Sequence, residues 1–200
     1  MTDTLAAAPS RRETNKRRTR QLLRETALQL FASQGYDSTT AEDIAEKAGV
    51  SSRTFFRYFA TKESALFIGR NNWMQSLATT FLEQPAALSD VDALREALVL
   101  IAPRIVSSRK ALRLYERAVA SSAALRGREA DYRQDDVAIL SEAIATRRGL
   151  PHADETCSLL AAVSFLTHRR ALDVWLAGPA RADLAVAIND EFDRLVRLFA

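Results

Sequence analysis

Apolar residues recur three and four positions apart along most of the chain, which is the spacing of one face of an α-helix. Helices are predicted over about 15–34, 61–85, 89–105, 108–121, 122–148 and 154–177, with two shorter ones between 39 and 62 and a last one after 178. No segment alternates apolar and polar residues as a strand would. The pattern therefore predicts an all-α fold of about nine helices.

Glycine and proline mark where several of these helices should end. Gly35 and Gly149 each follow a periodic segment, and glycine readily takes the left-handed conformation of a helix C-terminus. Pro103 falls inside an apolar pattern and should kink or split that helix, because proline lacks an amide hydrogen. Pro179 suits the first position of the last helix.

The most informative stretch covers residues 39–62 and reads TTAEDIAEKAGVSSRTFFRYFATK. Thr40 is suited to cap a helix of about two turns, and Asp43 lies three residues later, near the positive helix end. Gly49 should end that helix. Two short helices joined by a tight turn are typical of a DNA-reading helix-turn-helix, with an ordinary helical hairpin as the alternative.

The second short helix should bury one aromatic face and expose a polar one. Val50 should fill the turn before it, and Ser51 or Ser52 should cap it. We expect Phe55, Phe56 and Phe59 to face inward, leaving Ser52, Arg53, Thr54, Arg57 and Tyr58 to point outward.

Charge is distributed unevenly along the chain. The net charge is only +3, but residues 1–70 hold 12 Lys/Arg against 8 Asp/Glu, and much of this excess lies between residues 11 and 20. A basic block is usually a solvated tail, although beside a helix-turn-helix it can also contact DNA phosphates.

Composition narrows the location and the class of protein. The chain is 48% hydrophobic, yet no window resembles a membrane span and the N-terminus lacks the apolar core of a secretion signal. Its single cysteine, Cys157, rules out an internal disulfide and fits a reducing compartment. We therefore expect a cytoplasmic protein that has no membrane partner.

Catalytic chemistry is poorly supported. The two histidines, His152 and His168, are not in metal-ligand spacing with each other or with Cys157, and the six glycines form no phosphate-binding cluster. We expect neither an enzyme nor a cofactor. His168 interrupts an apolar helix, where it could contact a ligand, bond across an interface or mark an exposed edge; we favour the exposed edge.

Over residues 17–66 the ordered segments LFASQGYDSTT, DIAEKAGVS and RTFFRYFATKESAL resemble the TetR family of bacterial transcriptional regulators. Residues 1–14 show no periodicity and are expected to form a disordered basic arm. The resemblance implies a helix-turn-helix domain over 15–62 and a helical ligand-binding and dimerisation domain over 63–200. Residues 124–149, with ALDVWLA further on, are also similar to mycofactocin-type regulators, some of which sense acyl-CoA thioesters.

The family's DNA contacts can be placed on this sequence. The resemblance implies phosphate contacts at Thr40, Tyr58 and Lys62 and a DNA contact at Thr54. The full expected set is Arg17, Thr40, Ser51, Ser52, Arg53, Thr54, Arg57, Tyr58 and Lys62. Two positions depart from the family pattern. Arg53 replaces a small residue and could reach guanine O6 and N7, whereas Phe56 replaces a tyrosine and lacks its hydroxyl.

The last two predicted helices carry more apolar residues than one core should bury, which indicates a partner subunit, although both could also pack inside the monomer. The expected dimer contacts are Leu159, Val163, Leu166, Leu184, Ile188, Phe192 and Leu195, with Phe199 closing the stripe.

A ligand pocket is expected among the middle helices, although the same residues could form plain core. The candidates are Trp73, Leu77, Phe81, Leu98, Ile101, Arg104, Ile105, Tyr115 and Phe165, of which Arg104 would serve an anionic ligand. We expect a homodimeric repressor that a small, largely apolar effector releases from a palindromic operator on double-stranded DNA. The similarity to mycofactocin-type regulators adds an acyl-CoA-like effector as a candidate. A DNA-binding helical scaffold without a ligand is the alternative.

Overall fold

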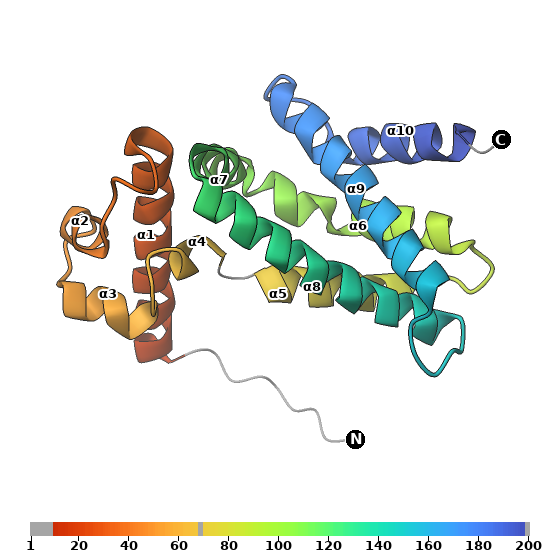
Figure 1. Cartoon of the computed structure of the whole chain (residues 1–200), viewed down its shortest axis with the longest axis horizontal. Helices are drawn as coiled ribbons and strands as arrows, with labels where there is room; N and C mark the ends of the chain where they lie inside the picture. The colour runs from red at the N-terminus through yellow and green to blue at the C-terminus, as the bar shows by residue number, and fades with distance from the viewer. Residues whose placement is uncertain (1–9, 68–69, 199–200) are drawn as a thin grey trace. The chain divides into compact units, whose positions relative to one another are not determined.

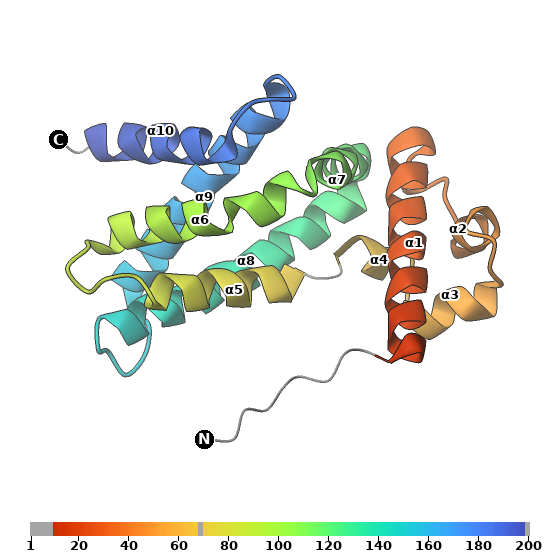
Figure 2. The same cartoon turned by 180° about the vertical axis from the view of Figure 1, so that it is seen from behind.

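The computed structural model describes residues 10–67 and 70–198, which form ten helices and no strand (Figures 1 and 2). They fall into two compact units, and each is described by itself. The all-α prediction is confirmed. The count exceeds the expected nine because the helix predicted over 61–85 is two helices, one of them a single turn.

The first unit contains α1 (Arg11–Gln34), α2 (Ala41–Lys47), α3 (Ser52–Tyr58) and α4 (Ser64–Phe67), joined by residues 114–125 from the end of α7 (Arg109–Ser121) and the start of α8 (Ala123–Arg147). Its core contains apolar side chains of α1 that recur four positions apart, together with apolar side chains of α2 and α3. Leu23, Ala27, Phe31, Ile44 and Phe55 have no exposed surface.

Helix α1 begins earlier than the sequence predicted. Ser10 and Glu13 form a reciprocal capping box, in which the Glu13 amide donates to Ser10 Oγ at 3.2 Å and the Ser10 amide donates to Glu13 Oε2 at 2.9 Å. Residues 11–14 are therefore helical and not part of a disordered arm. The rest of the predicted arm, 1–9, lies outside the described residues.

The second unit contains α5 (Arg70–Leu82), α6 (Asp90–Val106), the start of α7, most of α8, α9 (Glu155–Ala177) and α10 (Leu184–Arg197). Helix α10 packs on α9 and α6, and α6 also packs on α5. Within the described residues, no helix combines the length and apolar character that crossing a membrane requires.

Neither proline acts as a helix boundary. Pro103 does not split α6, which continues to Val106, because a proline removes only one backbone bond and its own carbonyl still accepts from the Ser107 amide. Pro179 does not begin α10. That helix starts at Leu184, where the Asp183 carboxylate accepts from the Ala185 amide at 2.8 Å.

Two arginines hold the turns of the second unit. Arg109 donates to four backbone carbonyls between Trp175 and Ala180 and lies 4.6 Å from the centroid of the Trp175 ring. Arg147 donates to the carbonyls of Gln84, Pro85 and Leu88. These bonds satisfy carbonyls at the end of α9 and in the loops that follow α9 and α5.

Candidate nucleic-acid interface and ligand-binding unit

The two short helices have the predicted caps and turn. The Asp43 amide donates to Thr40 Oγ1 at 3.0 Å, and the Thr40 amide donates to Asp43 Oδ2 at 2.8 Å. Hydrogen bonds from the Thr40 backbone and side chain lower the pKa of Asp43. Gly49 has φ 70°, the left-handed conformation expected where the chain turns from α2 toward α3.

Helix α3 is held by two of the three phenylalanines expected to face inward. Phe55 is fully buried and Phe59 is 3% exposed, with ring centroids 5.5 Å apart. Phe56 is 50% exposed, so its predicted inward orientation was wrong. Residues 55 and 59 are four apart and share a helix face, whereas residue 56 is turned about 100° away. Val50, expected to be buried, is half-buried.

The outward face of α3 carries two exposed arginines. Arg53 and Arg57 are exposed, and the Arg57 guanidinium carbon lies 5.3 Å from the centroid of the Tyr58 ring. Ser51 caps the helix by accepting from the Thr54 amide at 3.2 Å, and the Ser51 and Thr54 hydroxyls are 3.0 Å apart. Ser52, Thr54 and Tyr58 are half-buried, and Arg17 on α1 is exposed.

Lys62 has a structural role that sequence reasoning missed. Its Nζ donates to the carbonyls of Tyr36 at 2.7 Å and Thr39 at 2.8 Å, and lies 3.9 Å from the centroid of the Tyr36 ring. An ammonium has three N–H donors, so one remains for a phosphate. Its partners are backbone atoms more than twenty residues away, and no local sequence signal points to them.

Tyr36 and Glu63 reinforce this junction. The Tyr36 hydroxyl donates to Glu63 Oε2 at 2.9 Å. Burial and this bond to Glu63 raise the pKa of Tyr36. Burial raises the pKa of Glu63, but its own backbone amide and the Tyr36 hydroxyl outweigh that effect and lower it overall. The loop between α1 and α2 is thus fixed to the segment that follows α3.

The predicted ligand residues are partly brought together in the second unit. Four of them are buried in one apolar cluster, and three are half-buried against it: Leu77, Phe81, Leu98 and Ile101, then Trp73, Ile105 and Phe165. Tyr115 does not join them, because it lies in the first unit and its ring meets Phe67 edge-on at 6.0 Å. Arg104 is exposed and donates to Ser76 Oγ at 2.7 Å.

His168 is 3% exposed, so the expectation of an exposed helix edge was wrong. Its ring stacks on Trp73, with centroids 5.5 Å apart and planes 17° apart. Burial, with a smaller contribution from the nearby Arg169 charge, lowers the pKa of His168 to about 4. The imidazole is therefore neutral at pH 7.

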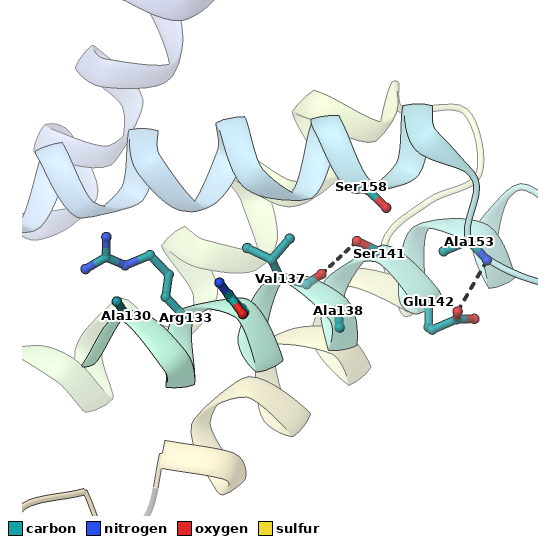
Figure 3. A pocket seen from close by; sticks show the side chains of 9 residues that line it. Ala130, Arg133, Val137, Ala138, Ser141, Glu142, Ala153 and Ser158 are labelled. Atoms are coloured by element: carbon teal, nitrogen blue, oxygen red, sulfur yellow. Dashed lines mark hydrogen bonds between the residues drawn. The ribbon is translucent and has the colours of Figure 1, made fainter. Parts of the chain in front are cut away.

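A separate groove of about 680 Å³ lies along α8 and the start of α9 (Figure 3). Two of its polar groups are already engaged, since Ser141 Oγ donates to the Val137 carbonyl and Glu142 accepts from the Ala153 amide. Its lining residues are Ala130, Arg133, Gln134, Val137, Ala138, Ser141, Glu142, Ala153 and Ser158. They include none of the ligand residues predicted from the sequence.

Three of the predicted dimer contacts are internal. Leu184, Ile188 and Phe192 have no exposed surface and belong to the core of the second unit, so their assignment to an interface was wrong. Leu159 and Leu166 are 66% and 64% exposed. Val163 and Leu195 are half-buried, and Phe199 lies outside the described residues.

The described residues contain no cluster of three or more His, Cys, Asp or Glu side chains that could hold a metal ion. In the described residues, the fold combines a helix-turn-helix unit with a second helical unit. Residues 23–67 match the family model described as "Bacterial regulatory proteins, tetR family". This helix-turn-helix region, residues 23–67, is therefore of the TetR family type.

Curated relatives support this assignment. The chain is 36% identical over 97 residues to the HTH-type transcriptional regulator TcmR of Streptomyces glaucescens, a match that covers 48% of this chain and 43% of that protein. It is 32% identical over 75 residues, 38% of each protein, to a protein of Mycobacterium tuberculosis named as the mycofactocin biosynthesis transcriptional regulator MftR. The matches span less than half the length of these relatives.

Solved structures share the fold along most of the chain. A SmeT–triclosan complex has a TM-score of 0.63 at 20% identity, with 88% of this chain and 91% of that chain covered. The repressor FadR of Thermus thermophilus, solved with lauroyl-CoA, has a TM-score of 0.55 at 22% identity, with 88% and 93% covered. At these identities the likeness shows the fold alone.

Proposed function

We propose that this chain is a homodimeric repressor that binds a palindromic operator in the cytoplasm and leaves it when a small, largely apolar molecule binds the second unit. The observation that carries the DNA-binding part is helix α3, which is anchored by buried Phe55 and Phe59 and presents exposed Arg53 and Arg57. A rigid helix with outward guanidinium groups can read base edges in the major groove.

The contacts divide into two kinds. Arg53, at the start of α3, is proposed to read a guanine, because a guanidinium can bond O6 and N7 together. The remaining expected contacts, among them Thr40, Tyr58 and the third N–H of Lys62, are proposed to hold phosphates and set the register. Arg17 adds positive charge from α1.

Selection of bound fragments from random duplex DNA tests this proposal. Recovery of a palindrome with half-sites about one helical turn, roughly 34–36 Å, apart supports it. Arg53→Ala should relax the preference at one symmetric pair of positions, at a cost of about 1–3 kcal/mol per contact. Arg128→Ala is the matched control, because Arg128 is also exposed but lies on α8. If no sequence is enriched, a DNA-binding scaffold is favoured instead.

For the dimer, we propose the exposed face of α9 as the contact between two copies. Leu159, Leu166 and Val174 are 66%, 64% and 50% exposed and lie seven and eight residues apart, which places them on one side of the helix. Such a stripe pairing with its symmetry mate would form a self-complementary interface. Val186 of α10 is a further exposed apolar side chain, at 55%.

For the effector, both a triclosan-like and an acyl-CoA-like molecule are candidates, because the similar folds of SmeT and FadR were solved with such ligands. Release follows only if the ligand binds the DNA-free state more tightly than the DNA-bound state. The test is the operator affinity measured with and without each ligand. An unchanged affinity at saturating ligand would count against that effector.

A further inference from the structure

Three neighbouring side chains in the second unit have buried polar atoms without a hydrogen-bond partner among the described residues. These atoms are Trp73 Nε1, both ring nitrogens of His168, and Ser164 Oγ. His168 is 3% exposed and Ser164 is 1% exposed. Most buried polar groups in proteins are paired, so several unpaired ones at one place call for an explanation.

The three side chains come from two helices. Ser164 and His168 are four residues apart on α9 and therefore share a face. Trp73 comes from α5 and stacks on the His168 ring at a centroid distance of 5.5 Å. The surrounding side chains form the apolar core of the second unit, against which Trp73 packs. Polar atoms are thus grouped inside an otherwise apolar environment.

The other tryptophan of the chain, Trp175, has a hydrogen-bond partner for its indole nitrogen. Trp175 is 1% exposed, and its Nε1 donates to the Ala182 carbonyl at 3.0 Å. The buried polar atoms of Trp73, Ser164 and His168 have no comparable hydrogen-bond partner in the described part of the chain. An unpaired buried donor or acceptor carries a desolvation penalty, which a bound molecule could remove by hydrogen bonding.

The available atoms define the chemistry of that molecule. The indole N–H only donates, whereas the hydroxyl and a neutral imidazole can each donate and accept. The nearby cations are already engaged: Arg104 donates to Ser76, and Arg169 pairs with Asp173 at 3.2 Å. An anion would therefore find no free buried counter-charge here, while a neutral oxygen would find both donors and an acceptor.

We propose that Trp73, Ser164 and His168 form the polar end of an effector site, which binds a neutral, largely apolar molecule through a hydroxyl group. This inference rests on the proposed ligand-responsive function and specifies its ligand class. The hydroxyl accepts from Trp73 or Ser164 and donates to the unprotonated nitrogen of His168, and the apolar remainder lies in the surrounding core. A buried water could satisfy the same atoms, and the experiment separates the two.

The experiment measures binding to the full chain by calorimetry with two matched sets of probes. The first set is 1-naphthol, naphthalene and 1-naphthoate, and the second is dodecan-1-ol and dodecane. At least one alcohol should bind about tenfold or more tightly than its hydrocarbon, which corresponds to one or two good hydrogen bonds. In the first set, 1-naphthoate should bind more weakly than 1-naphthol.

Variants connect the affinity to the cluster. His168→Phe keeps a ring beside Trp73 but removes both nitrogens, so it should weaken alcohol binding about tenfold and leave hydrocarbon binding unchanged. Ser164→Ala is a smaller change that tests the site if the first variant unfolds. His152→Phe is the matched control, because His152 is exposed in the loop before α9 and its loss should change neither affinity.

The proposal is overturned if neither alcohol binds saturably, if alcohol and hydrocarbon bind equally, or if both cluster variants retain wild-type alcohol affinity. Each of these results would leave water as the partner of the buried atoms. DNA selection with the ligand-free protein is a separate measurement. A recovered palindrome without alcohol binding overturns this inference alone, whereas alcohol binding without a palindrome overturns only the proposed regulator function.

Discussion

Substituting Phe192 by glutamate should unfold the second unit, although the sequence pattern alone placed Phe192 at a dimer contact. Phe192 has no exposed surface and lies in the core where α10 packs on α9 and α6. A charge at this position would be placed inside a single chain.

The magnitude follows from burial. Removing a buried phenylalanine side chain costs about 3–5 kcal/mol. A carboxyl group in its place adds a desolvation penalty, even if its pKa rises enough to keep it protonated. The total reaches the lower part of the range of roughly 5–15 kcal/mol that stabilises a typical domain. Phe192→Glu should therefore be largely unfolded at 25 °C.

Leu166→Glu is the matched control. Leu166 is 64% exposed, so the same charge should change monomer stability by no more than about 0.5 kcal/mol. If α9 forms the proposed dimer contact, however, the charge would be buried twice at the two-fold axis. This variant should be folded, monomeric and weak in operator binding.

Two measurements distinguish the variants. Urea unfolding followed by circular dichroism reports the fold, and sedimentation at micromolar concentration reports the oligomeric state. A Phe192→Glu protein with the wild-type urea midpoint would refute the placement of Phe192 in the core. A Leu166→Glu protein that remains dimeric would show that the subunits meet elsewhere.

Three further predictions test particular contacts. Lys62→Ala should lower the free energy of unfolding by about 1.5–3 kcal/mol, and with it the urea midpoint, because the bonds from Nζ to the Tyr36 and Thr39 carbonyls are lost. The same change should make the slope of log K against log[salt] for DNA binding shallower by about one unit per subunit. Arg147→Ala, which breaks three carbonyl bonds, should cost at least about 1.5–3 kcal/mol in the same assay, and an unchanged midpoint would refute its role. The pKa of His168 is lowered from 6.5 in the unfolded chain to about 4 in the folded protein, so between pH 4 and 6.5 the unfolded chain binds more protons. The free energy of unfolding should therefore fall by roughly 3 kcal/mol as the pH drops from 6.5 to 4, relative to that of His168→Phe. Parallel pH profiles of the two proteins would contradict the burial of a neutral imidazole.

The helix-turn-helix could be predicted because its determinants act over very short distances. The capping bonds of Thr40 with Asp43 and of Ser51 with Thr54 each join residues three apart. The left-handed conformation of Gly49 is also a local property. Local rules of this kind do not depend on how the rest of the chain folds, and they placed both ends of α2 and the start of α3 within a residue or two of the observed positions.

The contacts of Lys62 and His168 could not be predicted because they depend on segments far apart in the sequence. The carbonyl partners of Lys62 are 26 and 23 residues away. His168 lies between apolar residues and two arginines, and only the position of α5 decides that its ring is covered by Trp73. A periodic pattern shows which residues share a face but not what packs against that face.

The same limit explains why three residues of α10 were wrongly assigned to the dimer interface. The stripe of Leu184, Ile188 and Phe192 requires one buried surface, and α6 and α9 of the same chain provide it. Helix α9 is different, because its core face is occupied while Leu159 and Leu166 remain exposed on another side. A helix with one apolar face can bury that face against the core of its own domain. A helix with a second apolar face still exposes apolar side chains to solvent. The surplus on α9, and not the regular stripe on α10, is therefore where a partner subunit should be sought.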